Sequence, residues 1–488
     1  MLVPEISLTP QTVDRFISRF GEEKIAVLHS KLSIGERYDQ WQKIQKGIAK
    51  IVIGPRSAIF APVSDLGIII IDEEHDSSYK SEMSPRYHAR EVASFIAKEN
   101  NVPLVLGSAT PSIETYYKGL NKEIEILSLN KRANSMELPS VEIVDLRQEL
   151  ALGNRSMIST KLYGEIEKNL ENKKQTILFL NRRGFSTFVM CRDCGYTVKC
   201  KNCNVTLTYH SKEKKLKCHY CGFETNLMSN CPECKSLNIR YFGTGTQKLE
   251  AEINKLFPQA STIRMDIDTV SKKDSHEQIL NKFKNENVDI LIGTQMIVKG
   301  HHFPNVTLVG VIAADSSLNI EDFRANERTF QILTQVAGRA GREEKGRVII
   351  QTYNPDSFSI QYAKTQNYKI FYNTEIMLRK SLKYPPFCDI IMLLISGKDE
   401  KEVIDISKKL HSIIKQKIKA ENLKILLYSP VPSPIDKIKN KYRWRIIIKC
   451  KFDDLIVNSM NSVLEEFYNM KKSESARLII DLNPNNML

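Results

Sequence analysis

Short apolar runs divide the first 125 residues of the chain into alternating strand-like and helix-like segments. Apolar runs of this length are typical of strands that are buried on both faces of a parallel sheet. They occur at Ile25–Leu28, Ile51–Ile53, Leu66–Ile71 and Leu104–Leu106. A helix is predicted near the N-terminus, because apolar residues recur at helical spacing at Val13, Phe16, Ile17 and Phe20. We therefore expect an α/β lobe, with its ligand-binding residues at the carboxyl ends of the strands.

The next 250 residues or so repeat this pattern after a break. Residues 126–160 have weak periodicity and are predicted to form a connector. A second α/β lobe is expected over residues 161–190 and 235–375, interrupted by a cysteine-rich insertion at residues 191–234. Its strands are predicted at Gln175–Leu180, near Ile239, and at Asp289–Ile292, Thr307–Ile312 and Arg347–Gln351.

The last hundred residues have a different pattern, which predicts a small α+β domain over residues 384–488. A strand is expected at Tyr442–Cys450. It follows a helix whose core-facing residues are Val403, Ile406, Leu410, Ile413, Ile414 and Ile418.

Composition places the chain among globular proteins, with 42% hydrophobic and 26% charged residues in 488. The formal net charge of +14 favours a polyanionic partner. A biased genome composition would also explain it. No apolar run approaches the roughly 18 residues that a membrane helix needs. The N-terminus MLVPEISLTP lacks the pattern of a signal peptide, so we expect a cytoplasmic protein with reduced thiols.

Eight of the ten cysteines form four C-x-x-C pairs within 44 residues. Such pairs supply the four thiolates of a tetrahedral zinc site, so the array predicts two zinc ions. A disulfide framework and a redox pair are the alternatives, and neither fits four copies in a cytoplasmic protein. Spacing alone leaves open whether outer pairs join outer pairs or neighbours join neighbours. The pairs are Cys191/Cys194, Cys200/Cys203, Cys218/Cys221 and Cys231/Cys234; Cys388 and Cys450 are interpreted as buried thiols.

Two carboxylates follow the apolar run that ends at Ile71. Hydrolysis of a magnesium nucleotide needs such a pair, and we assign Asp72 to hold Mg²⁺ and Glu73 to orient and deprotonate water. An exposed acidic turn is the alternative. His75 is predicted to contact ATP, and the segment Ser108-Ala109-Thr110 is predicted to couple the nucleotide state to nucleic-acid binding.

The segment QVAGRAGR, from Gln335 to Arg342, supplies two arginines one helical turn apart. A guanidinium that faces the γ-phosphate accelerates phosphoryl transfer roughly 10³–10⁵-fold, so Arg339 and Arg342 are candidate catalytic residues. Two ordinary surface arginines are the alternative. Gln335 and Gly300 are predicted to contribute to ATP binding.

Cationic and aromatic residues mark candidate DNA contacts. The segment 76–90 interleaves both types, which suits base stacking, although a packed loop is the alternative. The predicted DNA-binding residues are Arg56, Tyr79, Arg86, Tyr87, His88, Arg183 and Trp444.

Taken together, these segments resemble the PriA family of bacterial replication-restart helicases. The match includes LVPEISLTPQ, IGPRSAIFAP, DEEHDSSYK, LGSATPS, FLNRRG, GTQMIVKGHHFPNVTLVG, FRANERTFQ, QVAGRAGR and YPPF. The resemblance implies two RecA-like lobes, the first truncated, and a two-zinc insertion in the second. One zinc would take Cys191, Cys194, Cys231 and Cys234, and the other Cys200, Cys203, Cys218 and Cys221.

The resemblance also implies an activity and partners. The family unwinds DNA 3′ to 5′ with Mg²⁺ and ATP, and it acts at abandoned forks on the bacterial nucleoid. The expected partners are forked and single-stranded DNA, primosome proteins, single-stranded DNA-binding protein and the loader of the replicative helicase. No membrane partner is expected.

One departure from the family pattern is the lack of a phosphate-binding loop, G-x-x-x-x-G-K-[ST], which should precede LVPEISLTPQ. The family's N-terminal DNA-binding domain is also expected to be missing. Without the loop's amides and lysine, we expect these 488 residues alone to bind ATP poorly and hydrolyse it weakly at most. The second hypothesis is a fork-binding scaffold that does not hydrolyse ATP. An RNA-directed helicase with zinc sites is a third.

Overall fold

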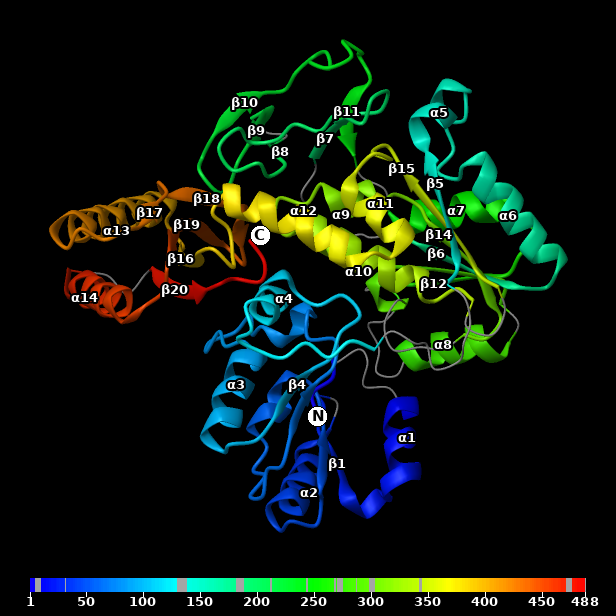
Figure 1. The fold of residues 1–488 in the computed structure, drawn as a ribbon. Coiled ribbons are helices and arrows are strands. Elements are labelled where there is room, and N and C mark those ends of the chain that lie inside the picture. The colour runs from blue at the N-terminus through cyan, green and yellow to red at the C-terminus, as the bar shows by residue number, and fades with distance from the viewer. Residues whose placement is uncertain are drawn as a thin grey trace. The chain divides into compact units, whose positions relative to one another are not determined.

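A computed structural model of the chain describes residues 1–4, 10–30, 32–129, 138–180, 188–210, 213–242, 245–266, 269, 275–286, 288–297, 303–341, 345–470 and 476–487. The chain divides into two compact units (Figure 1). Unit 1 consists of Met1–Leu129 and Met296–Phe303, and unit 2 of Asn130–Gln295 and Pro304–Leu488.

Unit 1 is built on parallel strands that the apolar runs predicted. Strand β1 (Ile25–Val27) pairs with β2 (Ile51–Ile53), and β3 (Ile69–Ile71) pairs with β4 (Leu104–Leu106). The N-terminal residues join the two pairs, because the Leu2 amide donates to the Ile70 carbonyl (2.7 Å) and the Val3 amide to the Gly54 carbonyl (2.9 Å). This bridging segment was not predicted.

Helices on unit 1 bury apolar side chains against these strands. They are α1 (Pro10–Phe20), α2 (Ile34–Gln45), α3 (Ala89–Glu99) and α4 (Ile113–Leu120). In α1, Phe16 and Ile17 pack on Val3, Ile25 and Ile53, as the helical spacing predicted. In α3 the small residues Ala89, Ala93 and Ala97 recur every fourth position and allow close packing on Leu2, Ile69 and Ile71.

Unit 2 contains a six-stranded parallel sheet in the order β12-β13-β6-β14-β15-β5. Its strands are β5 (Ser140–Asp145), β6 (Gln175–Phe179), β12 (Thr262–Met265), β13 (Ile290–Gly293), β14 (Val306–Val311) and β15 (Arg347–Thr352). Its helices are α5 (Leu146–Ala151), α6 (Thr160–Glu171), α7 (Thr246–Leu256), α8 (Ser275–Asn285), α9 (Asp315–Leu318), α10 (Ala325–Ala337), α11 (Phe358–Thr365) and α12 (Tyr368–Ser381). Four predicted strands of the second lobe are confirmed within one residue at each end, and the strand predicted near Ile239 belongs to the cysteine module instead.

The structure differs from the prediction at the connector and at the ends of the cysteine-rich insertion. The predicted connector contains β5, which pairs with β15 at the sheet edge, and its alternation of polar and apolar residues fits an edge position. The antiparallel strands β7 (Phe188–Cys191) and β11 (Ile239–Phe242) pair with each other beyond both ends of the predicted insertion. The prediction assigned most of both strands to the lobe, because it bounded the insertion by the first and last cysteines of the array.

The cysteine module therefore has a five-stranded antiparallel sheet, in the order β10-β9-β8-β7-β11. Its remaining strands are β8 (Thr208–His210), β9 (Lys215–Lys217) and β10 (Glu224–Asn226). Among its described residues, the module's buried core consists of five cysteines and seven other apolar residues, among them Val189, Val205 and Leu216. So small a core needs further cross-links to be stable.

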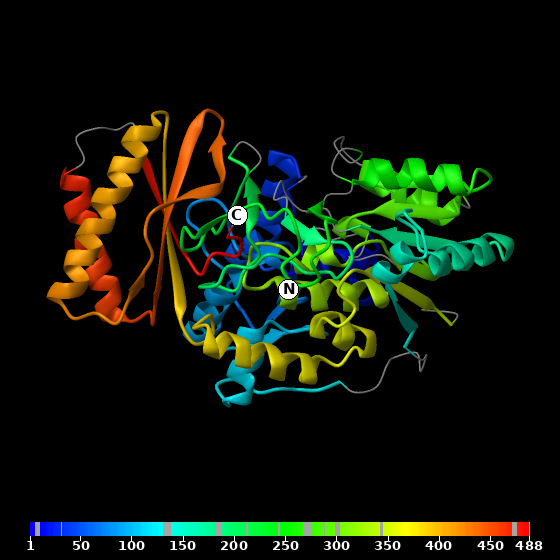
Figure 2. The same cartoon turned by 90° about the horizontal axis from the view of Figure 1, so that it is seen from above.

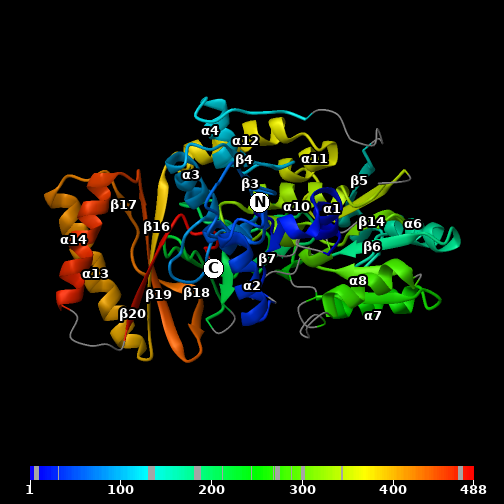
Figure 3. The same ribbon diagram turned by 90° about the horizontal axis from the view of Figure 1, so that it is seen from below.

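The C-terminal part of unit 2 is an α+β domain, as predicted. Helices α13 (Glu400–Ala420) and α14 (Asp454–Met470) lie together on one side of an antiparallel sheet (Figures 2 and 3). The strands are β16 (Asp389–Gly397), β17 (Leu426–Leu427), β18 (Val431–Ile438), β19 (Lys441–Cys450) and β20 (Arg477–Leu482). Within the described residues, no helix combines the length and apolarity that crossing a membrane requires.

Candidate metal centres and nucleotide-binding residues

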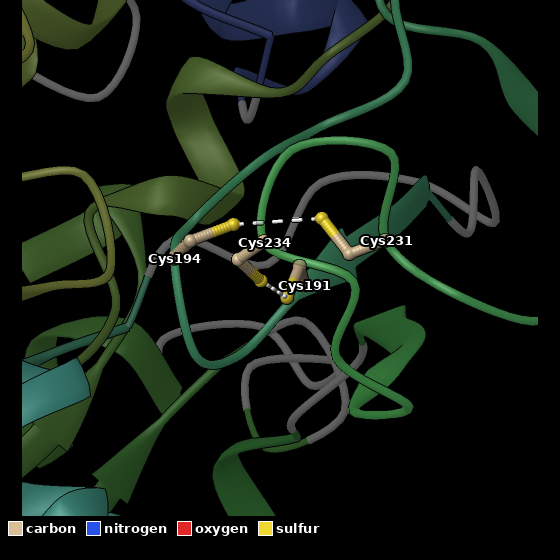
Figure 4. A group of neighbouring side chains, drawn as sticks. All are labelled: Cys191, Cys194, Cys231 and Cys234. Carbon is tan, nitrogen blue, oxygen red and sulfur yellow. Dashed lines mark hydrogen bonds between the residues drawn. The ribbon is translucent and has the colours of Figure 1, made fainter.

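The eight clustered cysteines form two groups of four, each with its sulfurs within 4.8 Å of one another. The first group joins the outer pairs and the second the inner pairs, so the nested arrangement is the one that the fold adopts. The first group is Cys191, Cys194, Cys231 and Cys234 (Figure 4), and the second is Cys200, Cys203, Cys218 and Cys221.

The spacing of the sulfurs fits tetrahedral zinc. Four Zn–S bonds of about 2.3 Å place the sulfurs about 3.8 Å apart. The Sγ atoms of Cys191 and Cys234 are 3.6 Å apart, and those of Cys194 and Cys231 are 3.5 Å apart (Figure 4). In the second group Cys200 and Cys221 are 3.5 Å apart. Both groups are therefore compatible with zinc binding.

The same backbone turn presents all four pairs. In each pair the carbonyl of the first cysteine accepts a hydrogen bond from the amide four residues later, at 2.8–2.9 Å. The residue that donates always has a positive φ. At Gly195 the turn also lies close to the segment after β15, because a Cβ there would clash with the Tyr353 carbonyl oxygen. The four donors are Gly195 (φ 76°), Asn204 (φ 55°), Gly222 (φ 77°) and Lys235 (φ 62°).

In unit 1, the carboxylates of Asp72 and Glu73 lie directly after β3, at the carboxyl end of the parallel strands. Glu73 has a positive φ of 46° and its amide donates to Asp72 Oδ1 (3.0 Å). Asp72 is exposed, and partial desolvation raises its pKa, while the Glu73 amide and His75 oppose that rise. This sharp turn leaves both predicted catalytic carboxylates at the strand end.

His75 links these carboxylates to the segment predicted to couple ATP and DNA. Its Nδ1 atom lies 2.7 Å from Ser108 Oγ and 3.6 Å from the Glu73 carboxylate. Ser108 Oγ in turn accepts from the Thr110 amide (3.0 Å). The structure thus brings three of the predicted residues into one hydrogen-bonded chain, with Ala109 inside the turn.

Glu74, which the sequence analysis did not single out, is buried at the centre of a polar cluster. Its carboxylate accepts from the Ser112 amide (2.6 Å), Thr115 Oγ1 (3.0 Å) and Arg90 Nη1 (2.6 Å). Burial alone would lower the pKa of Arg90, but the Glu74 carboxylate raises it above its ordinary value. The cluster ties the strand end to α3 and α4. The only signal of this polar cluster in the sequence is a serine, a residue type that caps helices, three residues before a threonine.

The loop that follows contains most of the predicted DNA contacts. Arg56 donates to the carbonyls of Ser78 (3.1 Å) and Lys80 (2.6 Å), and its guanidinium lies 5.7 Å from the centre of the Tyr87 ring. The half-exposed residues Arg86, Tyr87 and His88 follow one another before α3, and His88 caps that helix through Nδ1.

Tyr79 corrects one prediction. Its ring is fully buried, its hydroxyl donates to the Asp72 carbonyl (2.6 Å), and burial raises its pKa. A ring enclosed in this way belongs to the core and offers no face to a base. Trp444 lies in β19 of unit 2 and packs, partly buried, against the core beneath α13 and α14. Arg183 lies outside the described residues.

In unit 2, the predicted nucleotide contacts lie at the end of α10. Leu333, Val336 and Ala337 are buried, whereas Gln335 and Arg339, four residues apart, are partly exposed. Gly338 caps the helix and Arg339 follows it directly. Gly300 and Arg342 lie outside the described residues, as do His301 and His302.

Comparisons with known proteins agree with this geometry. Family profiles match at residues 1–118 (DEAD/DEAH box helicase), 200–225 (PriA DNA helicase Cys-rich region domain), 235–344 (Helicase conserved C-terminal domain) and 380–485 (Primosomal protein N C-terminal domain). These matches identify two RecA-like helicase lobes, a cysteine zinc module and a PriA-type C-terminal domain.

Similar proteins carry the same name over nearly the whole chain. The replication restart protein PriA of Bacillus subtilis is 49% identical over 100% of this chain, which spans 60% of that relative. The protein of that name from Treponema pallidum is 41% identical over 96% of this chain and 70% of its own length. Among solved structures, RecG bound to a three-way DNA junction matches with 13% identity and a TM-score of 0.40, over 78% of this chain and 43% of that one.

Proposed function

Because the chain belongs to the family of the replication restart protein PriA, we propose that it forms the motor of a replication-restart DNA helicase. In this proposal it binds abandoned or stalled forks and unwinds DNA 3′ to 5′ with energy from ATP. It then promotes assembly of the primosome that reloads the replicative helicase. The chain spans 60% of the Bacillus subtilis relative, so its activity and partners are proposals.

The observation that carries the proposal is the His75–Ser108 hydrogen bond of 2.7 Å. It joins two carboxylates at the end of β3 to a turn at the end of β4. The carboxylates suit nucleotide hydrolysis, with Asp72 placed to hold Mg²⁺ and Glu73 to orient water and take its proton. A change at Glu73 would reach Ser108–Thr110 through His75, as coupling to DNA requires.

The motif at the end of α10 supplies further proposed nucleotide contacts. Bound Mg-ATP supplies the bond that is broken, and Arg339 would stabilise the charge that develops on the γ-phosphate. Gln335, in the last turn of α10, is proposed to contribute to ATP binding. We assign Gly300 and Arg342 to the same nucleotide site by their places in the family motifs.

Zinc has a structural role in the proposal, with one ion in each cysteine group. DNA would be contacted by Arg56, Arg86, Tyr87 and His88 of unit 1, together with Arg183 and Trp444. Single-stranded DNA-binding protein, other primosome proteins and the helicase loader are the proposed protein partners. Family membership also supports action at the bacterial nucleoid.

A double substitution, Asp72→Asn with Glu73→Gln, tests the motor. We expect hydrolysis of ATP in the presence of forked DNA to fall at least about 100-fold, because metal binding and water activation are both lost. Fork affinity, measured by fluorescence anisotropy, should stay unchanged. The protein should be purified from its own cells at its native length, and Asp65→Asn, an exposed carboxylate of the same unit, is the control.

Unchanged hydrolysis in the double variant would reject the motor. The second candidate is a fork-binding scaffold that does not hydrolyse ATP. It predicts that the native protein hydrolyses no ATP with forked DNA, yet still supports restart. The intact mass of the native protein should be measured as well. Comparison with the 55.9 kDa of these 488 residues shows whether the tested protein has the same length.

A further inference from the structure

We propose that Arg379 is a positioning residue that sets the nucleotide-facing end of α10 according to the state of the cysteine module and the C-terminal domain. The inference rests on the proposed function, because it assumes that Arg339 serves the nucleotide. It concerns a cluster at the other end of the same helix, formed by Phe323, Glu327, Arg379 and Tyr384, which we name the α10 anchor.

The anchor begins with a buried ion pair. Glu327, in the first turn of α10, accepts from Arg379 Nη2 at 2.5 Å, and both side chains are buried. Arg379 lies on α12, where its Nε donates to Glu375 (3.0 Å) and its Nη1 to the Pro385 carbonyl (3.1 Å). All three branches of the guanidinium are thus used. Such a pair fixes geometry more than it adds stability.

Tyr384 extends the anchor to two other parts of unit 2. Its ring stacks face to face on Phe323, with centroids 4.5 Å apart, in the loop that leads into α10. Its hydroxyl donates to the carbonyl of Cys203 (3.1 Å), a residue of the second cysteine group. Lys449 of β19 lies 3.5 Å from the centre of the same ring. One side chain therefore touches the module, the C-terminal sheet and the start of α10.

The end of the chain is held at the same place. Arg324 donates to the Pro484 carbonyl (3.0 Å), and Arg328 donates to the Asn485 carbonyl while pairing with Asp322 (3.1 Å). These contacts hold residues just after β20 against the first turns of α10.

The opposite end of α10 carries Gln335 and Arg339. A helix of 13 residues is about 20 Å long and transmits displacement as a rod. A movement of the module or of the C-terminal sheet that displaces Tyr384 or Arg379 therefore shifts Arg339. This makes the anchor a link between the C-terminal sheet, which carries the proposed DNA contact Trp444, and the residue proposed to promote hydrolysis.

The substitution Arg379→Lys tests the inference, because it keeps the charge and removes the fork that holds three acceptors at once. We expect amide hydrogen exchange of residues 333–340 to accelerate about tenfold. Exchange of β6 and β14, in the same unit, should stay unchanged. DNA-stimulated hydrolysis of ATP should fall about tenfold, because the loosened end of α10 no longer holds Arg339 in place. Zinc content should also be unchanged.

A matched control and a milder variant complete the design. Arg264→Lys changes a similar arginine of unit 2, which pairs with Glu250 (3.1 Å) and Asp266 (2.8 Å) away from α10, and should leave residues 333–340 unaffected. Tyr384→Phe keeps the ring stack and removes the hydrogen bond to Cys203. It should raise exchange at the same residues even if Arg379→Lys fails to fold.

The exchange measurement needs neither DNA nor ATP, so it tests the α10 anchor independently of the proposed motor. Native exchange at residues 333–340 in both anchor variants overturns the inference, whatever the protein hydrolyses. Faster exchange that spreads equally through unit 2 also overturns it, since this is the result of general destabilisation. Faster exchange confined to α10 in a protein that hydrolyses no ATP supports the mechanical link and rejects the proposed motor.

Discussion

Three consecutive carboxylates, Asp72 to Glu74, take different environments at the end of one strand. Asp72 is exposed and Glu73 is turned by a positive φ, whereas Glu74 is buried and fully hydrogen-bonded. The difference follows from the turn, which sends neighbouring side chains to opposite sides. Glu74 therefore stabilises the frame from which Asp72 and Glu73 would act.

Replacing Glu74 by Gln should destabilise unit 1 by about 3 kcal/mol, because Arg90 loses its counter-charge in a largely buried site. Arg90 keeps some solvent contact, with 23% of its side chain exposed, which limits the cost. Urea unfolding followed by circular dichroism would measure the change. Glu91→Gln, an exposed acid in the first turn of α3, is the control and should stay within about 0.5 kcal/mol. Equal effects of the two substitutions would show that the cluster contributes nothing specific.

At the scale of elements, the cysteine module shows how one turn is reused with different residues. Glycine follows Cys194 and Cys221, but Asn204 and Lys235 occupy the same place in the other two turns. Asparagine adopts positive φ more readily than most residues, whereas lysine does so only when the surrounding structure requires it.

The nested pairing predicts the zinc content of double variants. Cys194→Ser with Cys231→Ser removes ligands from one group and should reduce zinc from two ions to one per chain. Cys194→Ser with Cys200→Ser removes a ligand from each group and should release both. Zinc would be measured by mass spectrometry of the metal in dialysed protein, with Cys450→Ser as the control. Pairing of neighbours would give the reverse result, since Cys194 and Cys200 would then share an ion.

At the scale of the whole molecule, the two units have separate cores and are expected to unfold separately. Calorimetry should show two transitions, because apolar clusters such as Val3–Ile25–Ile53 in unit 1 and Leu162–Leu178–Leu308 in unit 2 lie within single units. Glu74→Gln should lower only the transition of unit 1, by roughly 10 °C.

Removal of zinc by a chelator should lower only the transition of unit 2, since the module contacts the lobe and the C-terminal sheet through Tyr384 and Arg445. A single transition that responds to both the substitution and the chelator would contradict this division of the molecule.

Much of this protein is determined by local sequence. Apolar runs fixed the parallel strands, because a strand buried on both faces must be apolar throughout. Four C-x-x-C pairs fixed the metal chemistry, since few other roles require eight clustered thiols. The order of the motifs identified the family, and the positions of Asp72 and Glu73 after β3 followed from the strand itself.

Tertiary structure decided what depends on residues far apart in the chain. The pairing of the cysteines, the burial of Tyr79 and the strand β5 at the sheet edge each depend on partners that the local pattern does not reveal. The same holds for Glu74, whose partners lie 16 to 41 residues away, and for Glu327 and Arg379, which are 52 residues apart. A carboxylate side chain is chemically the same at the surface and in the core. Only folding brings a buried arginine next to it, and that contact decides whether the carboxylate is structural or exposed.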